Sequence, residues 1–351
     1  MSLRPDPFKN QYLFVDFLKT VAVQIIILHH LCNYGIIPLK AQELIPTFVD
    51  FMGIYGKYAV QIFLVIAGYL TAKSLTQTLQ KYGLIKTIIN RYLRLMPTYM
   101  VAILFTIVCA SIARSIAFES YMGDPETFPQ LLAHVFFLQS ILSYESISVG
   151  VWYVAIDWQL HMFAACLLFF LKSYKNVVIV LSFLMLSSFM YFSQHTVFDK
   201  YFIYFLGAYG LGILAYIAED NSQGKTQGIA QVLLILFVIL ILTITFYDLR
   251  IKNLVEIIIA LLLFLFGKKP YTPQNIMWSK FFLWFSQRSY CAFLIHFSVL
   301  LLCNSAFHLL KLHSAELSIF MMVIVWCLSW LFAHLLFKLV EFPSRKIQLK
   351  S

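Results

Sequence analysis

Charged side chains are scarce in this chain of 351 residues: they make up only 12% of it, whereas 61% of the residues are hydrophobic. A soluble domain of similar size has about 25% charged and about 45–50% apolar residues. No stretch is long and polar enough to form a separate soluble domain, and low-complexity linkers and clear internal repeats are missing. These absences exclude a soluble globular fold and predict a single integral-membrane domain over residues 1–351.

Other absences narrow the class further. The six cysteines lie in or beside apolar runs and lack metal-ligand spacing, so we expect them to fill the core and we expect no metal site. No small-residue cleavage site follows the first apolar run, which favours a retained helix over a signal peptide. The formal net charge of +10 would suit a nucleic-acid partner. Membrane topology explains this charge better, and no nucleic acid is expected.

Apolar runs of about 20 residues recur along the whole sequence, and an α-helix needs this length to cross a bilayer. The predicted fold class is therefore all-α: a polytopic membrane protein with about ten transmembrane helices and both termini in the cytoplasm. The predicted spans are 11–34, 57–73, 95–117, 151–171, 176–193, 201–218, 229–247, 253–267, 281–303 and 317–339.

The lysine and arginine residues set the orientation of these spans, because cytoplasmic loops carry an excess of them. With ten spans, most fall on the inner side, including Lys172, Lys175, Lys268 and Lys269. The apolar region 129–142 is a further candidate, but an eleventh span would reverse every later loop and place these four lysines outside. We therefore expect 129–142 to be a re-entrant or interfacial segment on the outer side.

The first predicted helix carries ionisable residues within an apolar stretch. The segment FVDFLKTVAVQIIILHHL contains Asp16, Lys19, His29 and His30. At about 100° per residue, Asp16, Lys19 and His30 share one face, and the helical rise places Lys19 and His30 roughly 16 Å apart. Each charge near a bilayer centre costs about 2.5–3.5 kcal/mol, so the stripe indicates a functional site. The alternative is a purely structural ion pair of Asp16 with Lys19.

Six blocks of the sequence resemble, in the same order, motifs of the membrane-bound acyltransferase-3 family. They are FVDFLKTVAVQIIILHH (Phe14–His30), AVQIFLVIAGYL (Ala59–Leu70), RYLRLMPTY (Arg91–Tyr99), VWYVAIDWQLHMF (Val151–Phe163), SYCAFLIHFSVL (Ser289–Leu300) and EFPSR (Glu341–Arg345). The resemblance covers nearly the whole chain. The sequence departs from the family pattern at Lys19, where Arg is usual, at Ala67, where Ser is common, and at Asp157, where Glu is common.

This resemblance implies a membrane O-acyltransferase. Such an enzyme moves an acyl group, usually acetyl, from cytosolic acyl-CoA to a hydroxyl of a carbohydrate or other acceptor at the outer face. The implied donor is acetyl-CoA, and the implied location is the bacterial inner membrane. The implied catalytic residues are His30, Lys19 and Asp157.

Further residues take implied binding roles. Arg91, Arg94 and Lys73 are cations on the inner side that would bind the phosphates of coenzyme A. Six others are expected to bind substrate or line the pore: Asp16, Gln61, Trp152, Tyr153, Gln159 and His296. The thioester is expected to pass along this pore toward His30.

Two mechanisms stay open at this stage. His30 acts either as general base on the acceptor hydroxyl or as an acyl carrier that is acylated first. Asp157 lies four residues before His161 on one helical face. It is expected to orient an imidazole or to hold the acceptor, unless the two residues form a structural pair.

Two other functions also stay open. A secondary transporter or flippase would suit ten helices with buried charges, although we find no paired Gly/Pro-interrupted helices at matching places in two halves. A catalytically inactive scaffold of the same fold would tolerate Lys19 and Asp157. The sequence does not determine the acceptor, the acyl chain length or the oligomeric state.

Overall fold

The computed structural model describes residues 12–268 and 276–347. Most of these residues are helical, and no β-strand occurs within the two ranges. The long helices are α1 (Leu13–Asn33), α4 (Ala59–Ile116), α6 (Val151–Leu171), α7 (Tyr174–Met190), α8 (Phe202–Glu219), α9 (Lys225–Tyr247), α10 (Ile251–Phe266), α11 (Ile276–Leu309) and α12 (Ala315–Leu336). The shorter ones are α2 (Ile36–Ala41), α3 (Pro46–Tyr55), α5 (Phe128–Val135) and α13 (Phe342–Ser344).

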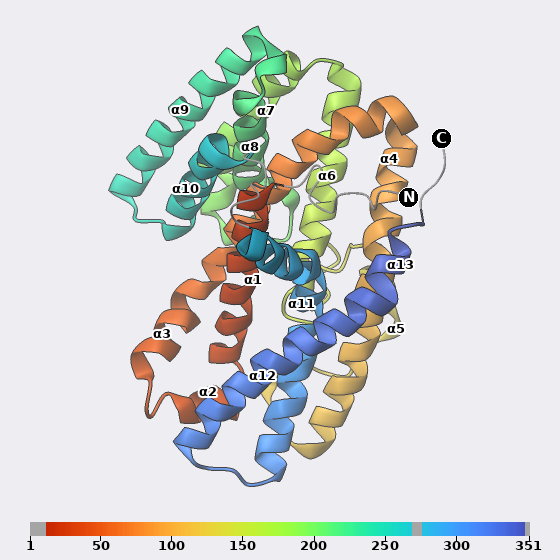
Figure 1. Ribbon diagram of the computed structural model, residues 1–351, viewed down its shortest axis with the longest axis vertical. Helices are drawn as coiled ribbons and strands as arrows, with labels where there is room; N and C mark the ends of the chain where they lie inside the picture. Colours follow the sequence, from red (N-terminus) through yellow and green to blue (C-terminus); the bar gives the residue numbers. More distant parts are fainter. Residues whose placement is uncertain (1–11, 269–275, 348–351) are drawn as a thin grey trace.

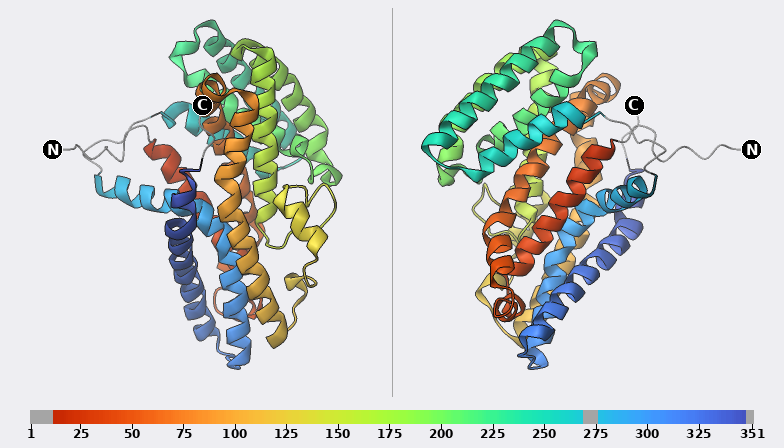
Figure 2. Two further views of the ribbon diagram at one scale, coloured as in Figure 1. Left: turned by 90° about the vertical axis from the view of Figure 1, so that its right-hand side faces the viewer. Right: turned by 60° about the vertical axis from the view of Figure 1, so that its left-hand side comes forward.

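The helices form two groups joined by α4. In Figure 1, α7, α8, α9 and α10 gather at the upper left, whereas α1, α11 and α12 lie in the centre and below, and α4 contacts both groups. The views in Figure 2 show the same division. We call the end of the bundle at the bend of α4 the inner end, because the sequence places that segment on the cytoplasmic side, and the opposite end the outer end.

Helix α4 is in fact two helices that meet at Gly83. The backbone of Gly83 has φ +72°, a left-handed conformation that glycine adopts without steric cost. The chain reverses there, as the bend at the upper right of Figure 1 shows. The predicted spans 57–73 and 95–117 fall on the two arms. The stretch between them, which the sequence predicts as a loop, is helical on both sides of the break.

Each of the ten predicted spans coincides with a helix or an arm of α4, so the all-α polytopic architecture is confirmed. By length and composition, eight helical stretches of the described chain qualify as membrane-spanning. Residues 46–116 form one of these eight stretches, and α10, which has only 16 residues, is not among them. Ten crossings therefore remain a prediction.

The outer segment 129–142 contains one short helix, α5, followed by turns. Thr127 and Gln130 form a reciprocal capping box at its start. Eight helical residues extend only about 12 Å, well short of a hydrocarbon core of about 30 Å. The geometry therefore agrees with a segment that does not cross the membrane by itself.

Two glycines allow α4 and α8 to approach closely. A Cβ atom added to Gly68 would lie 1.9 Å from the carbonyl oxygen of Tyr209, and one added to Gly212 would lie 1.9 Å from that of Val65. Each glycine therefore faces the backbone of the other helix. Small residues at such crossings allow membrane helices to pack without a hydrophobic driving force between them.

We predict that Gly212→Ala lowers the thermal midpoint of the detergent-solubilised protein. The added methyl group would force the two backbones apart, and overpacking of this kind costs about 1–3 kcal/mol or more. Gly228→Ala is the matched control, because Gly228 lies in α9 with no atom near its missing Cβ, and alanine there favours the helix by about 1 kcal/mol. Equal midpoints for the two variants would contradict the close approach.

Candidate functional site

A cavity of about 560 Å³ lies between α1, both arms of α4, α6 and α11, and it is closed by the turn before α13. The side chains in its wall come from six chain segments: Lys19, Phe63, Ile66, Ala67, Leu70, Thr71, Lys73, Ser74, Arg91, Arg94, Leu95, Tyr153, Val154, Asp157, Ser289, Tyr290, Phe293 and Glu341. The structure thus brings together six residues that the sequence places in the site: Lys19, Lys73, Arg91, Arg94, Tyr153 and Asp157.

An ion pair joins the second arm of α4 to α6 across this cavity. Arg91 Nη2 donates to Asp157 Oδ2 at 2.6 Å, and the Asp157 side chain is only 9% exposed. Asp157 therefore holds a guanidinium rather than an imidazole. His161, which the sequence offered as its partner, instead contacts Thr71: its Nδ1 lies 3.2 Å from Thr71 Oγ1.

Glu341 is a wall residue that the sequence analysis missed as part of the site. It lies in the single π-helical turn Phe337–Glu341 that precedes α13. Its Oε1 accepts from Arg345 Nη2 at 2.6 Å, and its Oε2 accepts from the thiol of Cys291 at 2.9 Å. The signal was present in the EFPSR block, where an acidic residue directly follows the last apolar run.

The cavity is electropositive. Its wall contains four cationic side chains and two carboxylates, and each carboxylate already has an arginine partner. Lys73 lies over the ring of Tyr12, 3.7 Å from the ring centroid. Lys19 and Arg94 form no hydrogen bond or ion pair with any residue of the described ranges. Uncompensated cations in a cavity between membrane helices favour a multiply anionic ligand.

A second polar centre lies further toward the outer end. His30 Nδ1 and His296 Nε2 are 2.7 Å apart, and the two ring planes are inclined by only 8° with centroids 5.0 Å apart, so the rings meet edge to edge. Both side chains are buried, at 7% and 2% exposure. The sequence placed the two histidines in one site, and the structure pairs them directly.

The hydrogen bonds fix the tautomers if both rings are neutral. His296 Nδ1 lies 3.0 Å from the carbonyl oxygen of Ala292, which can only accept, so His296 carries its proton on Nδ1. His296 Nε2 is then an acceptor, and His30 Nδ1 must donate to it. The lone pair of His30 therefore resides on Nε2, which forms no hydrogen bond with a described residue. A free imidazole lone pair is what a general base requires.

The route between these two centres differs from the expectation of an open pore. His30 and His296 do not line the cavity, because the aromatic side chains of Phe63, Tyr153 and Phe293 lie at its outer end. The imidazole of His30 is nevertheless buried within the helix bundle and does not face lipid.

Four other predicted site residues also lie outside the cavity wall. Asp16 Oδ1 accepts from the hydroxyl of Ser286 at 2.5 Å. The side-chain amide of Gln159 donates to the carbonyl of Phe137 at 3.3 Å and so ties α6 to the outer segment. Trp152 and Gln61 are further from the inner end than the wall residues of their own helices. Their functional roles remain predictions.

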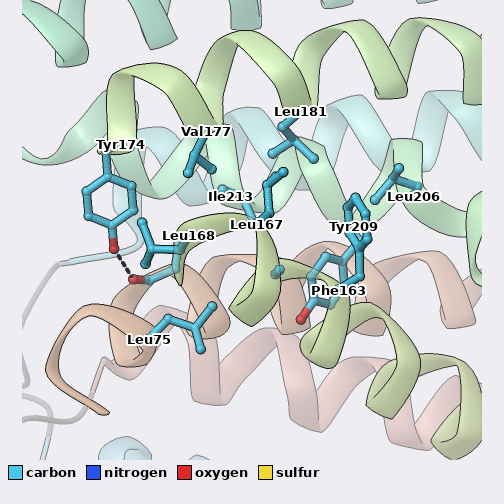
Figure 3. Close-up of a pocket in the computed structure, with 12 residues that line it drawn as sticks. Leu75, Phe163, Leu167, Leu168, Tyr174, Val177, Leu181, Leu206, Tyr209 and Ile213 are labelled. Carbon is cyan, nitrogen blue, oxygen red and sulfur yellow. Dashed lines mark hydrogen bonds between the residues drawn. The ribbon is translucent and has the colours of Figure 1, made fainter. Parts of the chain in front are cut away.

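A separate pocket between α4, α6, α7 and α8 is small and apolar (Figure 3). Its volume is about 20 Å³, room for about one water molecule. The hydrogen bond drawn in it joins the hydroxyl of Tyr174 to the carbonyl of Ala72 at 2.9 Å. Leucine, valine and isoleucine side chains provide most of its wall, and the hydroxyls of its two tyrosines, Tyr174 and Tyr209, already donate to Ala72 and Thr71.

We predict that Asp157→Ala and Arg91→Ala each lower the thermal midpoint, because each leaves one charge of the pair without its partner. The double variant should lose less stability than the sum of the two single losses, with a coupling of at least about 1 kcal/mol. The exposed pair Arg250–Asp248 provides a matched control cycle, for which a coupling of about 0–1 kcal/mol is expected. Additive losses for Arg91 and Asp157 would contradict a structural role for their contact.

Comparison with known protein families matches residues 12–334 to the acyltransferase domain of acyltransferase-3 type. No curated protein and no solved structure matches the chain. The matched region contains every residue of the cavity wall except Glu341, and it also contains His30 and His296. Because the match extends over most of the sequence, the chain belongs to the acyltransferase-3 family of membrane acyltransferases.

Proposed function

We propose that this membrane acyltransferase transfers an acetyl group from cytosolic acetyl-CoA to a hydroxyl of a carbohydrate acceptor at the outer face of the bacterial inner membrane. The observation that carries the proposal is the electropositive cavity, which shares helices α1 and α11 with the histidine pair. One helix pair thus presents both an anion site and a base.

The cavity suits coenzyme A because that molecule has a pyrophosphate and a 3′-phosphate. Arg94 and Lys19 have no hydrogen-bonding or ion-pair partner among the described residues, so they are available to phosphate oxygens. Charge-assisted hydrogen bonds from such groups are roughly twice as strong as neutral ones. Arg91 already donates to Asp157 and offers its remaining donors. Lys73 on the first arm of α4 faces the same space.

His30 would supply the proton transfer. In the direct mechanism, the acceptor oxygen attacks the thioester carbon while its proton moves to Nε2 of His30. The carbon–sulfur bond then breaks, and the coenzyme A thiolate leaves and takes up that proton. In the alternative, Nε2 itself attacks the thioester carbon and the coenzyme A thiolate leaves. The acceptor oxygen then attacks the acyl-imidazole, the carbon–nitrogen bond breaks, and the hydroxyl proton passes by way of Nε2 to the thiolate. The free Nε2 lone pair supports either mechanism.

The negative charge that develops on the thioester oxygen needs a donor. Lys19 is eleven residues from His30 on α1, roughly 16 Å along the axis. It is therefore better placed to bind the coenzyme A part of the donor than to donate to the thioester oxygen. Tyr153 lies at the outer end of the cavity beside Phe293. Its hydroxyl is the better candidate among the wall residues.

We predict that His30→Ala lowers acyl transfer by about 10²–10⁴-fold without preventing coenzyme A binding, since general acid–base catalysis contributes about that factor. The measurement is transfer of label from acetyl-CoA to an added glycan or to water in membranes that contain the purified protein. The control is His195→Ala, because His195 is exposed on an outer loop and its ring hydrogen-bonds, within the described chain, only to a carbonyl four residues earlier. Unchanged transfer by the His30 variant would exclude the mechanism.

We also predict that Arg94→Ala weakens acetyl-CoA binding by about 10–100-fold, because hydrogen bonds to charged groups contribute about 1.5–3 kcal/mol. Lys175→Ala is the control, since Lys175 is an exposed inner cation outside the cavity. Isothermal titration with coenzyme A gives both affinities. A transporter would instead show no dependence on coenzyme A in the wild type or the variants, whereas an inactive scaffold would keep its biological effect in the His30→Ala variant.

A further inference from the structure

The outer end of the cavity is closed by three aromatic side chains from three helices. The ring centroids of Phe63 and Phe293 are 5.9 Å apart, those of Tyr153 and Phe293 are 5.5 Å apart, and those of Phe63 and Tyr153 are 5.9 Å apart. The three rings are thus mutual neighbours. We call this group the aromatic partition.

The partition lies between the two polar centres. Phe63, Tyr153 and Phe293 are the outermost residues of the cavity wall on the first arm of α4, on α6 and on α11. On α11, Phe293 follows the wall residue Tyr290 by three positions and precedes His296 by three, and each step is about 4.5 Å along the axis. The ring of Phe293 is 6.3 Å from that of His296. It therefore separates the cationic space from the histidine pair.

The position of the Phe293 ring depends on a glycine at the start of α6. A Cβ atom added to Gly150 would lie 3.0 Å from both Cε1 and Cζ of Phe293. The ring is packed against this backbone and is only 5% exposed. Tight packing on one side and the other two rings on the cavity side leave it little free space.

We propose that the aromatic partition, with Phe293 as its central ring, sets the maximum length of the acyl group that this enzyme transfers. The inference rests on the proposed function, in which a thioester held by the cations presents its acyl group to His30. A two-carbon group needs little room between the rings and the imidazole. Each further methylene needs space that the three rings occupy.

The test compares transfer from acetyl-, butyryl- and hexanoyl-CoA by the full-length protein. Wild type should use acetyl-CoA most efficiently. Phe293→Ala should raise the ratio of hexanoyl to acetyl efficiency by about tenfold or more, since pocket fit discriminates by about that factor per group removed. Phe63→Ala should shift the ratio in the same direction. It serves as a second variant because Phe63 makes no ring contact with His296.

Phe163→Ala is the matched control. Phe163 is also an α6 aromatic residue, but it lines the small apolar pocket, away from the cavity, and its ring contacts that of Phe202 at a tilt of 32°. The ratio of hexanoyl to acetyl efficiency of the Phe163→Ala variant should equal that of wild type. Binding of non-hydrolysable thioether analogues of the same three lengths provides a readout that does not need turnover, and the partition variants should gain affinity for the longest analogue relative to the shortest.

Failure of the chain-length inference can be distinguished from failure of the proposed function. If wild type transfers acetyl groups but neither partition variant changes the chain-length ratio in turnover or binding, the partition does not set acyl length and the proposed function stands. If wild type neither turns over nor binds any acyl-CoA analogue, the proposed function and this inference fail together. A wild-type enzyme that already prefers hexanoyl-CoA would also overturn the inference.

Discussion

The architecture depends on the high free-energy cost of ionised side chains in a low-dielectric environment. A membrane helix tolerates such a group only where it has a partner, a polar cavity or an aqueous edge. Here several such groups gather where α1, both arms of α4, α6 and the π-helical turn converge. The contact between Arg91 and Asp157 neutralises one cation and fixes the second arm of α4 against α6. Lys19 and Arg94 face the same cavity without a hydrogen-bonding or ion-pair partner among the described residues, which makes the site electropositive.

The same principle explains why the histidines can be buried further along the bundle. A neutral imidazole carries no charge to desolvate, and the two rings share one hydrogen bond between Nδ1 of His30 and Nε2 of His296. The backbone carbonyl of Ala292 selects the tautomer of His296, and His296 selects that of His30. A chain of two hydrogen bonds thus decides which nitrogen of His30 is basic. The histidine pair and the cationic cavity thus lie at different depths along α1.

Hydropathy and charge bias predicted the helices well, because membrane insertion is governed by local apolar length and by the lysines and arginines of short loops. The same charge bias predicts that the outer segment 129–142 does not cross the membrane, and the short helix α5 agrees with that prediction. The contacts between side chains inside the bundle were harder to predict from the sequence. Asp157 is four residues from His161, yet it binds Arg91, which is 66 residues away in sequence. The sequence does not distinguish Phe293 from the other apolar residues of its helix. Its position between the two polar centres is seen only in the packed structure.

The break at Gly83 has a geometric consequence for the cavity. Lys73 belongs to the arm that enters the bend, and Arg91 and Arg94 belong to the arm that leaves it. The spacing between these cations therefore depends on the backbone angles of one residue that has no atom near its missing Cβ. In this chain, the distance between cationic side chains of the cavity is set by the main-chain angles of a residue outside the cavity wall, so a sequence change at that bend can alter the shape of the wall while every wall side chain is retained.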